Sequence, residues 1–229
     1  MNTTLPKDFN ENMRVENVNT ENTSTTNQQT SKHSQSASKL ATQSLIALYC
    51  GSRSGNNPIY KDKAIALAEK IAKHGMGIVY GGASIGLMGQ VADSVIGQGG
   101  EVVGVIPEFM LDYEIAHSTL TELHIVKTMH ERKAMMAERA CAFVALPGGL
   151  GTFEEILEIA TWGQLDQHQK PMIIYNVNGF YDALIAQLDH AVQEGFLPPQ
   201  HRAKIIICNH STEILNAVSN LKAPTNFVV

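Results

Sequence analysis

The chain has 229 residues, of which 44% are hydrophobic and 17% are charged, as is typical of a globular protein with one core. Its formal net charge of −5 is opposite to the clustered Lys and Arg excess of nucleic-acid-binding surfaces, so we expect no nucleic-acid partner. No apolar run is long enough to span a bilayer, so we expect no membrane association. The three cysteines lie in apolar runs, which is typical of reduced thiols and predicts a cytoplasmic location.

The first 43 residues differ in composition from the rest of the chain. They are rich in Asn, Thr, Ser and Gln and contain few large apolar residues. Such a segment cannot bury enough surface to offset the entropy lost on ordering. We therefore predict a disordered polar tail over residues 1–43 and one folded domain over residues 44–229.

Apolar runs that alternate with helical patterns follow the tail. Helical patterns begin near Pro58, Leu87, His130 and Phe153. The alternation predicts a doubly wound, Rossmann-like α/β fold, in which a parallel sheet carries helices on both faces. Ligands of such sheets bind beyond the carboxyl ends of the strands. The predicted strands span residues 45–50, 77–80, 101–106, 123–127, 141–146, 172–175 and 205–208.

A glycine-rich loop follows the fifth predicted strand. Gly148, Gly149 and Gly151 separate this strand from a helical pattern, so the backbone can approach a ligand closely. The partial positive charge at a helix N-terminus makes phosphate the natural ligand of such a loop. Glu155 follows one turn later, beside the predicted anion site. A phosphate site with an acid next to it predicts chemistry on a nucleotide.

The spacing of Thr152 and Glu155 permits a second interpretation. It matches a capping box, in which Thr152 is the N-cap and Glu155 reaches back to the backbone amide of Thr152. Glu154 is then a solvated acid that complements the helix dipole. The spacing alone does not separate a catalytic Glu155 from a capping one.

Arg132 and Lys133 lie at the start of another predicted helix, just after a strand. Two adjacent cations at this place favour either a contact to phosphate or carboxylate, or a solvated helix face. The glycine loop over residues 81–89 lacks the G-x-G-x-x-G pattern, and no acid ends the third strand, which argues against NAD. The nine histidines show no metal-ligand spacing. We expect no cofactor and no metal.

These residues together resemble the LOG (Lonely Guy) family of cytokinin riboside 5′-monophosphate phosphoribohydrolases, once loosely called lysine decarboxylase-like. The family motif P-G-G-x-G-T-x-x-E matches residues 147–155 at every fixed position, and M-H-x-R-K matches residues 129–133. The resemblance covers about residues 45–200. Three positions depart from the family: Ala83 replaces a usual glycine, Cys141 a common aspartate, and Asp166 a usual glycine.

The resemblance implies a reaction and a set of roles. A nucleoside 5′-monophosphate loses its base to water, and Glu155 and Arg132 are the catalytic pair. Glu155 stabilises positive charge on the ribose, and Arg132 orients Glu155 and keeps it ionised. The resemblance also implies a homodimer. The residues implied to contact the nucleotide are Glu114, Lys133, Gly148, Gly149, Leu150, Gly151, Thr152 and Thr161.

The resemblance leaves other functions open. A general AMP or GMP nucleosidase has the same chemistry, because base specificity depends on loop shape near Met88, Leu111 and Tyr113. A non-catalytic nucleotide or cofactor carrier of the same fold is a further alternative, which the intact Arg132 and Glu155 disfavour. Lysine decarboxylase is the weakest alternative. Lys61, Lys63 and Lys133 all lie in helical segments and have no sequence context that would anchor a cofactor.

Overall fold

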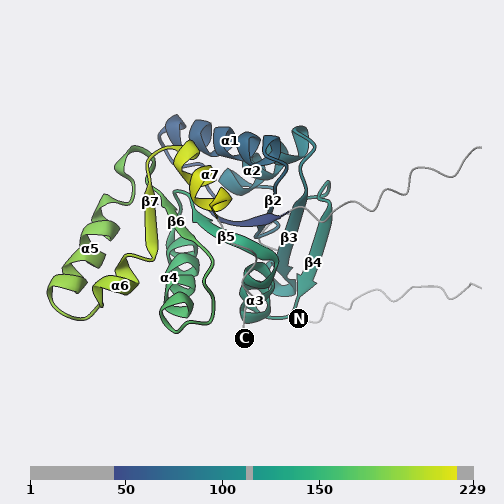
Figure 1. Ribbon diagram of the computed structural model, residues 1–229. Helices are drawn as coiled ribbons and strands as arrows, with labels where there is room; N and C mark the ends of the chain where they lie inside the picture. The colour runs from purple at the N-terminus through teal and green to yellow at the C-terminus, as the bar shows by residue number, and fades with distance from the viewer. Residues whose placement is uncertain (1–43, 112–115, 221–229) are drawn as a thin grey trace, which may run out of the picture. The chain divides into compact units, whose positions relative to one another are not determined.

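The structure is a computed structural model that describes residues 44–111 and 116–220. Seven strands form one parallel sheet in the order β4-β3-β2-β1-β5-β6-β7 (Figure 1). Each strand lies within one residue of its predicted run, so the predicted Rossmann-like sheet is confirmed. The strands are β1 (Leu45–Tyr49), β2 (Gly77–Tyr80), β3 (Val102–Pro107), β4 (Glu122–Val126), β5 (Ala140–Ala145), β6 (Met172–Tyr175) and β7 (Ile205–Cys208).

Helices cover both faces of the sheet. Helices α1, α2 and α7 pack on one face, whereas α3, α4 and α5 pack on the other (Figure 1). Among the described residues, no helix is both long and apolar enough to cross a membrane. The helices are α1 (Pro58–Lys73), α2 (Gly86–Gly97), α3 (Met129–Arg139), α4 (Leu150–Gln164), α5 (Asp182–Gln193), α6 (Pro199–Arg202) and α7 (Ser211–Ser219), with short 3-10 turns η1 (Glu108–Met110) and η2 (Val177–Gly179).

Strand β1 lies at the centre of the sheet and is buried on both faces. Ile46 and Leu48 pack with α1 and α2, whereas Leu45, Ala47 and Tyr49 pack with α3 and α4. A strand covered on both faces has no solvent-facing positions, which explains its continuous apolar sequence. Its alternating side chains therefore join the two layers of the core.

The ends of α1 show how local sequence sets helix boundaries. The side chain of Asn57 accepts a hydrogen bond from the Ile59 amide at 3.0 Å, and Pro58 occupies the first helical position. The helix ends at Lys73, and Gly75 follows with a φ of +71°. The start of the helix agrees with the pattern predicted to begin near Pro58.

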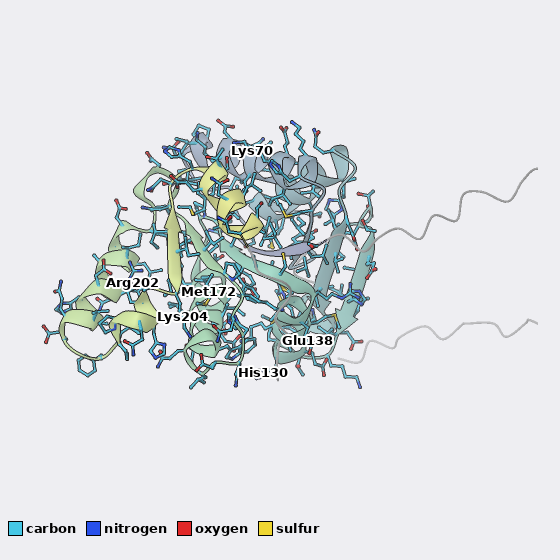
Figure 2. The ribbon with its side chains drawn as sticks, viewed as in Figure 1. Lys70, His130, Glu138, Met172, Arg202 and Lys204 are labelled. Atoms are coloured by element: carbon cyan, nitrogen blue, oxygen red, sulfur yellow. The ribbon has the colours of Figure 1, made fainter. Side chains whose placement is uncertain are left out.

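The carboxyl end of α4 is held by β6 and the segment before β7. Lys204 Nζ donates to the Gly163 carbonyl oxygen at 2.7 Å, and Met172 packs against Gly163 (Figure 2). A cation at a helix C-terminus neutralises the partial negative charge there. This anchors the far end of the helix whose N-terminus carries the predicted phosphate loop.

The chain changes direction across the sheet between β1 and β5. Strands β2, β3 and β4 extend the sheet on one side of β1, and β5, β6 and β7 extend it on the other. The loops after β1 and β5 consequently meet, and the Gly51 amide donates to the Pro147 carbonyl oxygen at 3.2 Å. A crevice at such a switch point is the usual ligand site of this architecture.

Candidate active site

A cavity of about 240 Å³ lies at this switch point. Its walls include Arg132 of α3, Glu155 of α4 and the start of α4. The structure therefore brings the predicted catalytic pair and most of the predicted phosphate loop to one site. The loop residues that line this cavity are Gly149, Leu150, Gly151 and Thr152.

The N-terminus of α4 differs from the capping-box interpretation. The helix begins at Leu150, its N-cap is the extended Gly149, and no side chain caps it. Thr152 is the third helical residue and is buried, so it is not the N-cap. That interpretation was wrong, because the backbone enters the helix three residues earlier than the Thr-to-Glu spacing suggested.

Gly148 is required by close packing between loops. A Cβ at this position would collide with Thr152 Oγ1 and lie 2.9 Å from the Gly51 amide nitrogen. Gly148 itself does not line this cavity, although it lies against the neighbouring turn after β1. The first amides of an α-helix have no partner within the helix, so the uncapped start of α4 presents donors at the cavity wall.

Arg132 is a buried cation with weak partners. It is 5% exposed, and its Nη1 donates to Met110 Sδ at 3.3 Å and Met129 Sδ at 4.0 Å. Its Nε has no hydrogen-bond partner among the described residues. Thioethers are weak acceptors, so this guanidinium has hydrogen-bonding capacity left for an anionic or polar ligand in the cavity.

A cap holds Arg132 at the start of α3. Thr128 is the N-cap, and its hydroxyl accepts from the Glu131 amide at 3.1 Å. The Glu131 carboxylate accepts in turn from the Lys127 amide at 2.7 Å. The Thr-x-x-Glu pattern therefore forms a cap at α3 and not at the start of α4, and it places Arg132 in the first turn of α3 at the cavity.

Glu155 is half-buried and influences the groups beneath it. Burial raises the pKa of the Cys50 thiol, and the nearby Glu155 carboxylate raises it further. Burial and the Glu155 charge likewise raise the pKa of Tyr49. Cys50 lines the cavity but stays a thiol at neutral pH, so it is no nucleophile. The carboxylate of Glu155 is the group suited to act as a base.

Lys133 lies outside the lining of the cavity. It is 8% exposed, and its Nζ lies 2.6 Å from Glu154 Oε1 and 3.0 Å from Glu158 Oε1. Burial lowers the pKa of Lys133, but hydrogen bonds to the two carboxylates outweigh burial and leave the pKa raised. Glu154, expected to be only solvated, is thus an ion-pair partner. The nucleotide contact expected of Lys133 stays a prediction.

Thr161 does not line the cavity, and the structure does not describe Glu114. Thr161 is exposed on α4, and its hydroxyl donates to the Leu157 carbonyl oxygen at 2.8 Å. Glu114 falls outside the described residues, so its role stays a prediction. Ala83, where the family has glycine, is buried and pairs with Ala116 in an isolated antiparallel bridge.

Sequence reasoning missed two parts of the site. The cavity has a wall of methionines, Met88, Met110 and Met129, of which only Met88 had been connected with the base. The turn after β1 also lines it through Gly51 and Ser52. Glycines flank this turn, and it follows the first strand, which was a usable signal for a ligand-binding turn. Its position beside the loop after β5 depends on the strand order.

The sequence is similar to known proteins over most of its length. A family model described as possible lysine decarboxylase matches residues 88–218. A cytokinin riboside 5′-monophosphate phosphoribohydrolase of Rhodococcoides fascians is 43% identical over 190 residues, covering 82% of this chain and 94% of that protein. A probable enzyme of the same name from Oryza sativa subsp. japonica is 48% identical over 157 residues, 69% of each chain.

Solved structures share the fold at low sequence identity. The molybdenum cofactor-binding protein of Rippkaea orientalis superposes with a TM-score of 0.58 at 18% identity, covering 77% of this chain and 96% of that one. The molybdenum cofactor carrier protein of Chlamydomonas reinhardtii gives 0.57 at 19% identity, with the same coverage. This likeness concerns the fold alone, whereas the sequence matches identify the family. The chain belongs to the LOG family of cytokinin riboside 5′-monophosphate phosphoribohydrolases, which includes proteins described as possible lysine decarboxylases.

Proposed function

We propose that this chain hydrolyses the N-glycosidic bond of cytokinin riboside 5′-monophosphates and releases the free base and ribose 5-phosphate. The name of the relatives at 43–48% identity supports this reaction. The observation that carries it is a single cavity lined by Glu155, Arg132 and the uncapped start of α4. An acid, a cation and a phosphate-binding helix terminus are the groups that the reaction requires.

Glu155 acts on the ribose and on water. As the bond from C1′ to the base nitrogen breaks, its electron pair goes to the base and positive charge develops on the ribose. The Glu155 carboxylate stabilises this charge and accepts a proton from the water that attacks C1′. The departing base nitrogen finally takes up the proton, so the charges balance.

Arg132 supports this chemistry through its unused donors. Among the described residues, the acceptors of this guanidinium are thioethers, so it can donate to the substrate or to a carboxylate without losing a stronger bond to them. A cation near Glu155 also favours the ionised form that a base requires. Arg132 therefore orients Glu155 and keeps it charged.

The 5′-phosphate and the purine of the substrate contact different parts of the cavity. The amides at the start of α4 bind the 5′-phosphate, so nucleotides are selected over nucleosides. The thioethers of Met88, Met110 and Met129 offer a polarisable wall to the purine. Such a wall takes adenine with or without an N6 substituent, which is why AMP belongs in the substrate test.

Lysine decarboxylation would require a lysine at the cavity to hold the cofactor. Among the described residues, no lysine lines the cavity, and Lys133 is held by two carboxylates. Lys170 Nζ donates to the Ala137 carbonyl oxygen at 2.7 Å, and burial lowers its pKa. These two lysines tie structural elements together, and neither lines the cavity.

We also propose that the protein acts in the cytoplasm as a homodimer without a nucleic-acid partner. The resemblance to the LOG family supports the dimer, and the net charge of −5 disfavours nucleic-acid binding. Roles for Glu114, Lys133 and Thr161 in nucleotide binding belong to this proposal. Size-exclusion chromatography with light scattering measures the oligomeric state.

Incubation of the purified protein with isopentenyladenosine monophosphate and with AMP tests the reaction. We expect equal amounts of free base and ribose 5-phosphate, with the cytokinin nucleotide as the better substrate. Preference for AMP would instead identify a general nucleosidase. Nucleotide binding without any ribose 5-phosphate release would identify a carrier and contradict the proposal.

A further inference from the structure

The cavity that holds Glu155 is smaller than usual sites for small-molecule ligands and continues into a second cavity. Its volume of about 240 Å³ is below the ~300 Å³ at which sites for small-molecule ligands usually begin. A second cavity of about 540 Å³ adjoins it. The two share four residues, Gly51, Ser52, Gly149 and Leu150. A nucleotide with C1′ beside Glu155 therefore extends across this shared edge.

The two cavities differ in charge. The first contains the carboxylates of Glu154 and Glu155, whereas the described walls of the second contain no carboxylate. The second contains Arg53 and the hydroxyl groups of Ser52 and Ser54. A phosphate is favoured in the second cavity or at the shared edge, where it avoids like charge and reaches a cation.

The turn that carries Arg53 is held firmly. The Gly51 carbonyl oxygen accepts from the Leu87 amide at 3.1 Å. A Cβ at Gly86 would collide with the backbone of Ser52, so α2 begins directly against this turn. Ser54 Oγ accepts from Gln90 Nε2 at 3.2 Å. The backbone of the turn is thus fixed, while the Arg53 side chain is exposed at the cavity.

The other cations near the site are already engaged or differently placed. Lys133 is held by two carboxylates, and Arg132 lies with Glu155 in the first cavity. Arg53 has no ion pair with a carboxylate in the described ranges 44–111 and 116–220. A phosphate monoester carries close to two negative charges at neutral pH, more than one helix N-terminus neutralises.

We infer that Arg53 binds the 5′-phosphate of the substrate in the second cavity, together with Ser52 and the first amides of α4. The purine then lies toward the methionines of the first cavity, and C1′ lies between the two ends beside Glu155. This inference rests on the proposed function for the identity of the ligand. It assigns Arg53 as a substrate-binding residue that recognises phosphate but takes no part in bond breaking.

The substitution Arg53→Gln tests the assignment, with Lys63→Gln as a control of equal charge change on the exposed face of α1. We expect Arg53→Gln to raise KM for the monophosphate about 10- to 100-fold, the size of one lost charge-assisted hydrogen bond, with kcat within about twofold. Turnover of the riboside, which lacks the phosphate, stays as in the wild type. Lys63→Gln leaves both substrates unchanged.

Calorimetric binding of ribose 5-phosphate to the same variants separates this inference from the proposed function. If the wild type binds ribose 5-phosphate but hydrolyses no nucleotide, the proposed reaction fails, and weaker binding by Arg53→Gln still supports the assignment. Unchanged binding and KM in Arg53→Gln overturn it. Equal weakening for riboside and monophosphate also overturns it, because Arg53 would then contact the base or ribose. Absence of binding to the wild type contradicts both.

Discussion

Lys133 Nζ lies 2.6 Å from Glu154 Oε1, and this ion pair joins α3 to α4 directly beside Arg132 and Glu155. Each member of the ion pair is the sequence neighbour of one member of the proposed catalytic pair. Glu158 Oε1, at 3.0 Å from the same Nζ, adds a second link one turn later. We therefore expect the spacing of Arg132 and Glu155 to depend on these ion pairs.

Replacement of Lys133 by Met should consequently lower kcat more than it raises KM. The variant leaves the carboxylates of Glu154 and Glu158 without a cation, and we expect a loss of about 2 kcal/mol of unfolding free energy, since Glu154 is half exposed. Urea unfolding and steady-state kinetics measure the two effects. A rise in KM alone, without loss of stability, would show that Lys133 contacts the nucleotide instead.

Glu155→Gln should keep the fold and abolish most activity. The amide neither carries the negative charge that stabilises the ribose cation nor accepts a proton, so we expect kcat to fall about 10²- to 10⁴-fold. Glu138→Gln, on the exposed side of α3 (Figure 2), is the matched control with unchanged kcat. Ribose 5-phosphate release measures both variants. Near-normal turnover by Glu155→Gln would exclude Glu155 as the base.

Gly151→Ala separates a glycine needed by the fold from one needed by a ligand. A Cβ at Gly151 meets no atom within 4 Å, so the folded protein tolerates alanine there. We expect unchanged or slightly higher stability but at least tenfold weaker binding of the monophosphate, because the methyl group intrudes where the phosphate approaches. Gly97→Ala, at an equally open position on α2, is the control. Unaltered binding by Gly151→Ala would place the phosphate elsewhere.

His168 should make the protein less stable in mild acid. Its Nε2 lies 2.9 Å from the Ile159 carbonyl oxygen, and its Nδ1 accepts from the Lys170 amide at 3.2 Å, which requires the neutral ring. Burial lowers the pKa of His168 below its ordinary value of 6.5. The folded state then binds fewer protons than the unfolded state, so this stability is present above about pH 6.5 and is lost as the pH falls toward the folded pKa.

Urea unfolding of the wild type and of His168→Gln at pH 7.5 and 5.5 measures this effect. Gln retains a donor for Ile159 but does not titrate, so the variant should show a smaller difference between the two pH values. Equal pH dependence in both proteins would assign the acid sensitivity to other groups.

Asp166 has a backbone conformation that favours glycine. Its φ is +57°, in the left-handed region, at a position where the family usually has glycine. Its contact to Lys204 Nζ, 3.1 Å, is at the surface and contributes little. We expect Asp166→Gly to be neutral or stabilising by up to about 1 kcal/mol and Asp166→Ala to be destabilising by about 1 kcal/mol. The midpoint of chemical unfolding checks both, and a stabilising alanine would contradict the argument.

Local sequence patterns were sufficient to predict the strands and the candidate catalytic residues of this protein. The seven strands followed from apolar runs bounded by turn residues, and Pro58 marked the start of α1, because these signals act between residues close in the chain. The motifs around Arg132 and Glu155 identified the catalytic candidates before the structure placed both in one cavity.

Other features depended on contacts between distant segments. Thr152 resembled an N-cap, but the packing of Gly148 against Thr152 and Gly51 lets α4 begin at Leu150. Helices α5, α6 and α7 were not predicted individually, since the strand alternation implied only a helical crossover between β6 and β7.

The sequence by itself determined the fold class, and it predicted the phosphate loop and Glu155 as the acid, since each depends on residues a few positions apart. Only the tertiary structure decided that β1 lies beside β5, which brings Arg53 to the phosphate loop, and that Lys133 binds Glu154 rather than facing the cavity. The physical reason is that a side chain's partner depends on which backbone segments the sheet brings within a few ångströms, and spacing along the chain does not carry that information.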